Sequence, residues 1–309
     1  IIFKPNFNMI KNKILLFLAA TLISINSSLA ADLKQATTAK LSSELNGLKN
    51  NFIGNAITSL ENLIIENIPN TEASITASEN QKPEWEIITV QPLIDNGEDI
   101  TFFQGSLLRW DGDRDTINLG IGQRKFLMNK NIMIGVNAFY DHELEVDHSR
   151  LGLGTELITS VGEARYNIYS ANSNAIENLD RGAGAKESVY DGRDFELGTH
   201  IPYIPAWKIY AKYFEWDLGN IENNGYTYTS EFSTPFGLII SAGITKYDNS
   251  KDEQPFIKIS YNSNNKSKDK KITQNSAYNF NSVEGKKLTK VRRENKIKIK
   301  KIGFTVSAV

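Results

Sequence analysis

The side chains with the greatest chemical reactivity are few in this chain of 309 residues, which has three histidines and no cysteine. By residue type, His142, Asp147 and His148 could bind a metal, but their spacing matches no recognised ligand pattern. His200 stands apart from them, and no GxSxG motif provides a serine nucleophile beside a base. We therefore expect no enzymatic activity, no metal site and no cofactor.

The sequence Gly120–Arg124 (GIGQR) has the glycine spacing of half a phosphate-binding loop. It lies inside a predicted strand, however, and no helix follows it to direct backbone N–H groups at a phosphate. A steric role for Gly120 and Gly122 is the simpler interpretation.

Three segments around these glycines alternate strictly between apolar and polar or glycine residues, at 115–126, 132–143 and 149–159. Alternation with a period of two predicts antiparallel strands with one apolar face. The other face is rich in glycine and charge, which suits a water-filled barrel interior better than a solvent-exposed sheet. The residues expected on this inner face or in the surrounding motifs are Gly120, Gly122, Gln123, Arg124, Asn137, Phe139, Asp141, Arg150, Gly152, Gly154 and Glu156.

The turns between these segments predict the strand register. A turn at Met128–Lys130 and another near Val146 give the cross-strand pairs Gly120–Phe139, Gly122–Asn137, Phe139–Gly152, Asn137–Gly154 and Asp141–Arg150. Large inward side chains beside cross-strand glycines fit a narrow barrel interior.

The same alternation extends over most of the chain and predicts an all-β fold, a transmembrane antiparallel barrel of about twelve strands. Short connections alternate with longer ones, as in outer-membrane barrels. We expect aromatic residues near the two membrane interfaces at Trp110, Trp207, Tyr213, Trp216, Tyr226 and Tyr228. A soluble β-sandwich is the alternative, against which the polar inner face counts. The predicted strands are 72–78, 84–93, 100–110, 115–126, 132–143, 149–159, 162–172, 193–202, 206–217, 225–235, 237–247 and 254–262.

The predicted barrel, residues 71–262, is preceded by three segments. Residues 1–8 come before the first methionine and are expected to be untranslated or disordered. Residues 9–30 have two lysines, an apolar run and small residues before Ala30, which is typical of a signal peptide. Residues 31–70 are predicted to be a periplasmic helical segment, because apolar residues recur at three or four positions over 33–68. This helix could pack on the barrel, plug it or mediate self-association.

Composition limits the partners of the chain. The net charge of −1 gives no reason to expect nucleic-acid binding, and 40% hydrophobic residues argue against helical membrane spans beyond the leader. A barrel is compatible with these averages because only alternate strand residues face lipid. We therefore expect lipid of the outer membrane as the main environment.

A basic tail, residues 263–309, follows the last predicted strand. Thirteen Lys or Arg residues and three acidic residues lie between Lys266 and Lys301. A water-filled lumen with carboxylates could hold such a segment, so we expect Arg292, Arg293 and Lys296 to lie near inward-facing glutamates. The glutamates expected there are Glu156, Glu163, Glu196 and Glu231. A solvated periplasmic tail is the alternative.

The motifs NLGIGQRKF, GVNAFYD and SRLGLGTE together resemble the β-domain of the inverse autotransporters, the intimin and invasin family, and the resemblance covers roughly residues 50–300. It implies a translocator and anchor barrel in the outer membrane of a Gram-negative cell, with the N-terminus in the periplasm. It also implies insertion by the barrel-assembly machinery with periplasmic chaperones, and export of a C-terminal passenger that is short or missing here. A small porin-like or structural barrel is the alternative function.

Overall fold

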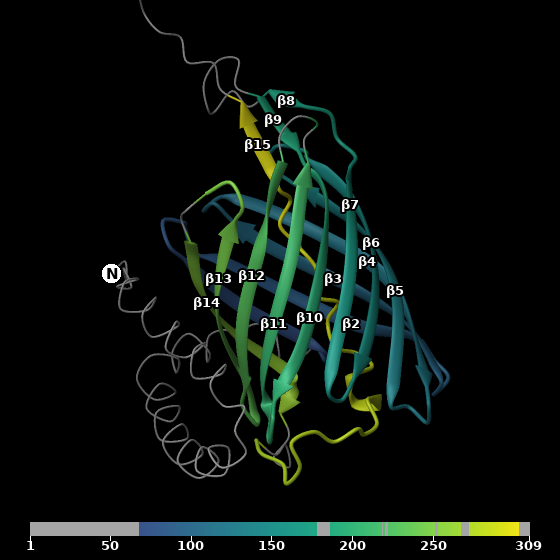
Figure 1. Cartoon of the computed structure of the whole chain (residues 1–309). Helices are drawn as coiled ribbons and strands as arrows, with labels where there is room; N and C mark the ends of the chain where they lie inside the picture. Colours follow the sequence, from purple (N-terminus) through teal and green to yellow (C-terminus); the bar gives the residue numbers. More distant parts are fainter. Residues whose placement is uncertain are drawn as a thin grey trace, which may run out of the picture.

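The computed structural model describes residues 68–177, 186–217, 219, 222–250, 253–266 and 272–302. Twelve antiparallel strands form a closed barrel (Figure 1), which confirms the predicted fold class. The predicted signal peptide and N-terminal helix lie outside the described residues. Among the described residues, no helix has the length and apolar character needed to cross a lipid bilayer. The barrel strands are β1 (Thr71–Ser78), β2 (Glu84–Asp95), β3 (Asp99–Trp110), β4 (Arg114–Leu127), β5 (Ile132–Glu143), β6 (Ser149–Thr159), β7 (Gly162–Ala171), β10 (Asp191–Ile201), β11 (Ile204–Asp217), β12 (Glu222–Ser233), β13 (Phe236–Tyr247) and β14 (Glu253–Lys266).

The barrel closes because β1 pairs with β14, with Ala73 opposite Tyr261 and Ile75 opposite Ile259. Each other barrel strand pairs with its neighbours in the chain, except that β7 pairs with β10 across a longer insertion. Closure leaves no exposed sheet edge, which is the condition for a sheet to span a bilayer.

The connections at the two ends of the barrel differ in length. At one end, which we call the turn end, β4 and β5 are joined by residues 128–131, and β6 and β7 by residues 160–161. At the opposite end, which we call the loop end, residues 172–190 separate β7 from β10. This long connection contains β8 (Ile176–Glu177) and β9 (Lys186–Val189).

Burial in the barrel is inverted relative to that of a soluble protein. Leu153 on the outer face is 56% exposed, whereas Arg124 on the inner face has no exposed surface. The same pattern follows the alternation along β4, β5 and β6. Apolar residues that point outward match a lipid environment, and buried charges match an enclosed polar interior.

The predicted register of the three central strands is confirmed. Gly120 pairs with Phe139 and Gly122 with Asn137 between β4 and β5. Phe139 pairs with Gly152, Asn137 with Gly154 and Asp141 with Arg150 between β5 and β6. Gln123 has the opposite parity to its neighbours Gly122 and Arg124, so it is exposed on the outer face and does not face the lumen.

Two of the predicted interface aromatics lie inside the barrel, which corrects that expectation. Trp110 is buried against Arg114 and Lys296, and Trp216 is buried against Tyr169. The cause in β3 is that both faces of this strand carry apolar residues, so alternation alone does not decide the inward face. Tyr226 and Tyr228 are exposed on the outer face of β12, which a position at a membrane interface requires.

A small sheet at the loop end was not predicted. Its strands β8, β9 and β15 (Ile299–Ile302) lie beyond the barrel in Figure 1. β15 pairs antiparallel with β9, with Ile299 opposite Val189. The alternation of Lys and Ile over 296–302 predicted an extended segment, but the partner strand is in a loop more than a hundred residues away.

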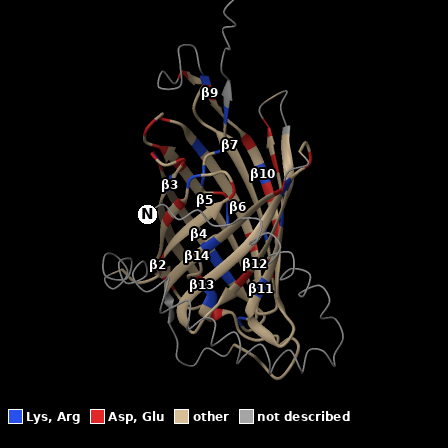
Figure 2. Cartoon of the chain, turned by 90° about the vertical axis from the view of Figure 1, so that its left-hand side faces the viewer, with Lys and Arg blue, Asp and Glu red and all other residues tan. Residues whose placement is uncertain are grey.

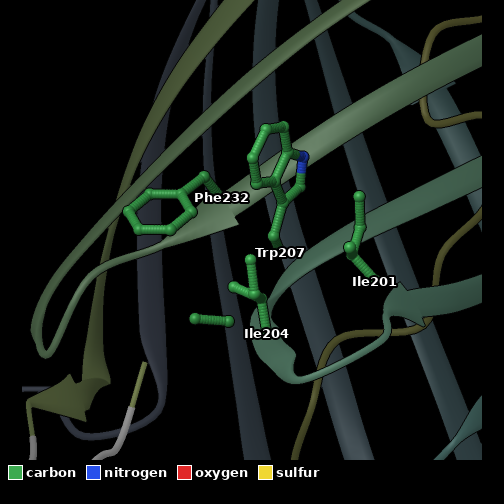
Figure 3. Packing of buried hydrophobic residues seen from close by; sticks show 5 residues of the cluster. Ile201, Ile204, Trp207 and Phe232 are labelled. Atoms are coloured by element: carbon green, nitrogen blue, oxygen red, sulfur yellow. The ribbon is translucent and has the colours of Figure 1, made fainter. Parts of the chain in front are cut away.

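A cluster of apolar side chains lies at the turn end, where Ile201, Ile204, Trp207 and Phe232 pack together (Figure 3). Trp207 and Phe232 are cross-strand partners whose rings pack edge to face, with the ring centroids 6.4 Å apart. The Trp207 indole N–H donates to the Ser230 hydroxyl at 2.8 Å. Ile272, from the chain after β14, packs against this cluster, so the cluster holds the start of the tail beside the barrel.

Candidate functional site in the barrel lumen

The interior of the barrel is occupied by the chain's own C-terminal region. Residues 283–298, which we call the lumenal segment, run inside the ring of strands from the turn end to the loop end (Figure 1). At the turn end the Val283 N–H donates to the Lys130 carbonyl at 2.7 Å. At the loop end the Tyr190 N–H donates to the Lys298 carbonyl at 2.9 Å. The chain therefore passes through the whole length of the barrel.

Residues 272–282 lead to this segment along the turn end. The Gln274 N–H donates to the Tyr203 carbonyl at 2.9 Å, and the Tyr203 N–H donates to the Ala277 carbonyl at 3.1 Å. Tyr278 then packs its ring on His200, with the ring centroids 5.0 Å apart. His200 thus contributes to packing at the mouth of the barrel, and this contact could not be inferred from its isolated position in the sequence.

The lumen wall is lined by buried ion pairs between strands, and Figure 2 shows basic and acidic residues close together along the barrel. Arg124 on β4 bonds Glu156 on β6 at 2.5 Å. The two side chains meet across Gly135 on β5, where an added Cβ would lie 2.7 Å from a Glu156 carboxylate oxygen. A glycine in the middle strand therefore lets charges two strands apart form a pair.

A second arrangement repeats around the wall: a cross-strand glycine, an aromatic ring over it, and a guanidinium over the ring. At Gly122 the ring is Phe102 and the cation is Arg124, whose Cζ lies 4.3 Å from the ring centroid. Such cation–π contacts are strongest where water is excluded. Two further stacks are Gly120–Phe139–Arg293 and Gly198–Tyr210–Arg292.

Gly120→Ala is expected to destabilise the barrel, because the new Cβ would lie 2.3 Å from two ring atoms of Phe139. Overpacking of this kind costs about 1–3 kcal/mol. The midpoint of urea unfolding in detergent micelles measures the change, and a second substitution, Phe139→Leu, is expected to recover part of it.

Gly285→Ala is the matched control, since nothing lies within 4 Å of its added Cβ. Equal midpoints for Gly120→Ala and Gly285→Ala would contradict the steric role of Gly120.

Basic side chains of the lumenal segment pair with carboxylates of the wall. Arg292 bonds Glu196 through two nitrogens, at 2.6 and 3.1 Å, and Glu231 at 3.1 Å. Arg293 bonds both oxygens of Asp141, at 2.8 and 2.7 Å. Three lysines make single contacts: Lys290 with Glu72, Lys287 with Asp95 at 2.7 Å, and Lys296 with Glu84 at 2.5 Å.

These contacts confirm part of the predicted pairing and correct the rest. Glu196 and Glu231 do bind Arg292, as expected. Glu156 and Glu163 form no ion pair with Arg292, Arg293 or Lys296. On the wall, Glu156 pairs with Arg124 and Glu163 pairs with Arg165. Lys286 of the segment does reach Glu163, at 3.4 Å. The sequence-based prediction missed the roles of Asp141, Glu72 and Glu84 as partners of the tail, although each has the inward parity on its strand.

The predicted lumenal residues are brought together as follows. Asp141 and Arg150 form a pair at 2.7 Å, and both side chains have no exposed surface. Asn137 is buried beside Gly154. A Cβ added to Gly154 would lie 2.6 Å from the side-chain oxygen of Asn137. Gly152 faces Arg293, whose nitrogen would lie 2.8 Å from an added Cβ. The glycines thus provide the space in which the lumenal segment fits.

Residues 22–295 match a family model described as the inverse autotransporter β-domain. The chain belongs to this family. It is therefore an outer-membrane β-barrel, in agreement with the exposed apolar outer face. The family resemblance inferred from the motifs around Gly120 and Gly152 is confirmed.

Relatives of the chain include three curated proteins. A putative attaching and effacing protein homolog of Escherichia coli K12 is 31% identical over 41% of this chain and 43% of that protein. Intimin of Escherichia coli O157:H7 is 31% identical over 40% of this chain and 13% of its own length. Invasin of Yersinia enterocolitica is 26% identical over 42% and 16%, respectively. The chain thus spans less than half of the length of the curated relatives it matches.

A solved structure from a study of in-meso crystallization of membrane proteins is similar in fold. It superposes with a TM-score of 0.61 and 21% identity, and covers 75% of this chain and 99% of that chain. At this identity the likeness supports the barrel fold alone.

Proposed function

We propose that this chain is the translocator and anchor of an inverse autotransporter, and that it carries a C-terminal passenger from the periplasm to the cell surface. The turn end faces the periplasm and the loop end faces the exterior. The barrel inserts through the barrel-assembly machinery with the help of periplasmic chaperones. Residues 9–30 are removed as a signal peptide, residues 31–70 form a periplasmic helical segment, and residues 263–309 link the barrel to the passenger.

The observation that supports this proposal is the lumenal segment itself. β1 starts at the turn end, and Lys298 leaves the barrel at the loop end. The two ends of the described chain therefore lie at opposite ends of the barrel, as export through the lumen requires. The chain continues past the loop end, where β15 pairs with β9. A tail that only neutralised the carboxylates of a porin-like barrel would not need this continuation.

The test is surface labelling of an epitope tag at Val309 in intact cells. The tag is expected to react without permeabilisation, because it follows the segment that leaves at the loop end. A matched tag at Gly97, in the turn between β2 and β3, is expected to react only after the outer membrane is permeabilised. If the Val309 tag needs permeabilisation and the Gly97 tag does not, the orientation is reversed. If both need it, the tail stays in the periplasm and the porin-like alternative holds.

A further inference from the structure

We propose that the Arg292–Arg293 pair is the stop element of translocation, the feature that fixes which residues of the polypeptide remain in the lumen. This inference rests on the proposed translocator function and assigns its register-determining residues. The sequence contains one Arg-Arg dipeptide, and it lies in the lumenal segment.

The two arginines bind the segment to different parts of the wall. Arg292 reaches Glu196 on β10 and Glu231 on β12, with its Cζ 3.7 Å from the centroid of the Tyr210 ring. Arg293 reaches Asp141 on β5, and its Cζ lies 4.3 Å from the Phe139 centroid. Each guanidinium has a carboxylate partner in its plane and a ring over its face, a combination that suits arginine and not lysine.

Several other hydrogen bonds between wall and segment involve the backbone of the segment. The Gln104 side chain accepts from the Val291 N–H at 2.7 Å, and the Tyr169 hydroxyl accepts from the Glu294 N–H at 2.8 Å. Arg150 donates to the Glu294 carbonyl at 2.6 Å, and Arg124 donates to the Lys287 carbonyl at 2.7 Å. Contacts with the main chain hold an extended peptide of any sequence, whereas side-chain pockets select a register. The wall thus holds the main chain at several points, and of its contacts with side chains of the segment, those with Arg292 and Arg293 use the most hydrogen bonds.

The lysines of the segment are weaker candidates for this role. Lys287, Lys290 and Lys296 each make one carboxylate contact, whereas Arg292 and Arg293 each bond a carboxylate through two nitrogens. A shift of the chain by two residues toward the exterior would place Lys290 at the Arg292 pocket and Val291 beside Asp141. A shift by two in the other direction would place Glu294 against Glu196 and Glu231. The observed register is the one that puts an arginine in both pockets.

Disulfide formation at the exit measures the register, since the chain has no native cysteine. Tyr190 and Lys298 form a hydrogen-bonded pair, so Val189 and Ile299 are a non-hydrogen-bonded pair, in which side chains are close. Val189→Cys is combined with either Ile299→Cys or Ile297→Cys in the full chain in outer membranes. Without an insertion, the cysteine at position 189 is expected to form a disulfide with position 299 in preference to position 297.

Two insertions of Gly-Ser then locate the stop. Insertion between Lys287 and Leu288, before the arginines, is expected to leave the crosslink at position 299. Insertion between Asn295 and Lys296, after them, is expected to move it to position 297 (parent numbering), with a preference of about tenfold or more, as the strength of close charge pairs implies. Arg292→Gln with Arg293→Gln is expected to abolish this preference, and Lys287→Gln with Lys296→Gln, the matched control, to keep it.

Each other outcome overturns the proposal in a recognisable way. A crosslink that stays at 299 after both insertions would show that pairing of β15 with β9 sets the register. A crosslink that moves to 297 after both would assign the register to the turn end. Absence of any crosslink in the parent would instead show that the segment does not leave at the loop end in cells, and this would refute the translocator function itself.

Discussion

Asp141→Asn is expected to lower the free energy of unfolding by about 3–5 kcal/mol, the range for breaking a buried ion pair by removal of one partner. Asp141 accepts from Arg150 and Arg293, both at 2.7 Å. Neither Asp141 nor Arg150 has exposed side-chain surface, so no water is available to replace the lost charge. The substitution keeps the volume but leaves two guanidiniums side by side without a counter-charge.

The measurement is urea unfolding of the full chain in detergent micelles, followed by tryptophan fluorescence. Asp115→Asn provides the control, because Asp115 pairs with Arg109, whose side chain is 45% exposed. Exposed pairs contribute much less to stability than buried ones, because water screens them. Similar losses for both variants would show that the Asp141 cluster is hydrated and does not hold the lumenal segment.

Removal of the lumenal segment by a stop codon after Asn281 is expected to convert a closed barrel into a cation-selective pore. The segment supplies a cationic partner to each of Asp141, Glu72, Glu84, Glu196 and Glu231. Without it these carboxylates would line a water-filled lumen, and rings of carboxylates favour cations. The full chain is expected to show little conductance, since the segment and its side chains occupy the same space.

Planar-bilayer recordings in a KCl gradient measure both properties. The truncated chain is expected to give discrete current steps with a reversal potential shifted toward that of K⁺. Glu196→Gln with Glu231→Gln in the truncated chain is the control, and is expected to reduce the shift while the steps remain. Equal conductance of the full and truncated chains, or selectivity for chloride, would contradict occupation of the lumen by the segment.

The strand register around Gly120 could be predicted because three features of the sequence agree. Strand side chains alternate with a period of two, the turns near Met128 and Val146 fix which residues face each other, and a slip by one residue would turn Asp141 toward lipid. The structure has the predicted pairs Gly120–Phe139 and Asp141–Arg150. Local pattern and turn position are enough for such contacts because the strands are neighbours in the chain.

Alternation was insufficient where both faces of a strand are apolar. In β3 the inward residues include Ile100 and Phe102, while Leu107 on the opposite face is exposed. Pairing of Phe102 with Gly122 on β4 decides the inward face, because only a glycine leaves room for the ring. Trp110 is eight residues after Phe102 on the same strand, so it shares the inward face with Phe102.

The sequence by itself determined the antiparallel strands, their inward charges and the basic character of the tail. Only the tertiary structure decided which carboxylate meets which base. Arg293 binds Asp141 and Glu156 binds Arg124, because barrel closure and the height of each residue in the lumen fix the distances between strands. β15 and β9 are likewise far apart in the chain. They meet because the lumenal segment runs through the barrel and places β15 at the loop end. Contacts of this kind depend on three-dimensional distance, which no local pattern of side chains encodes.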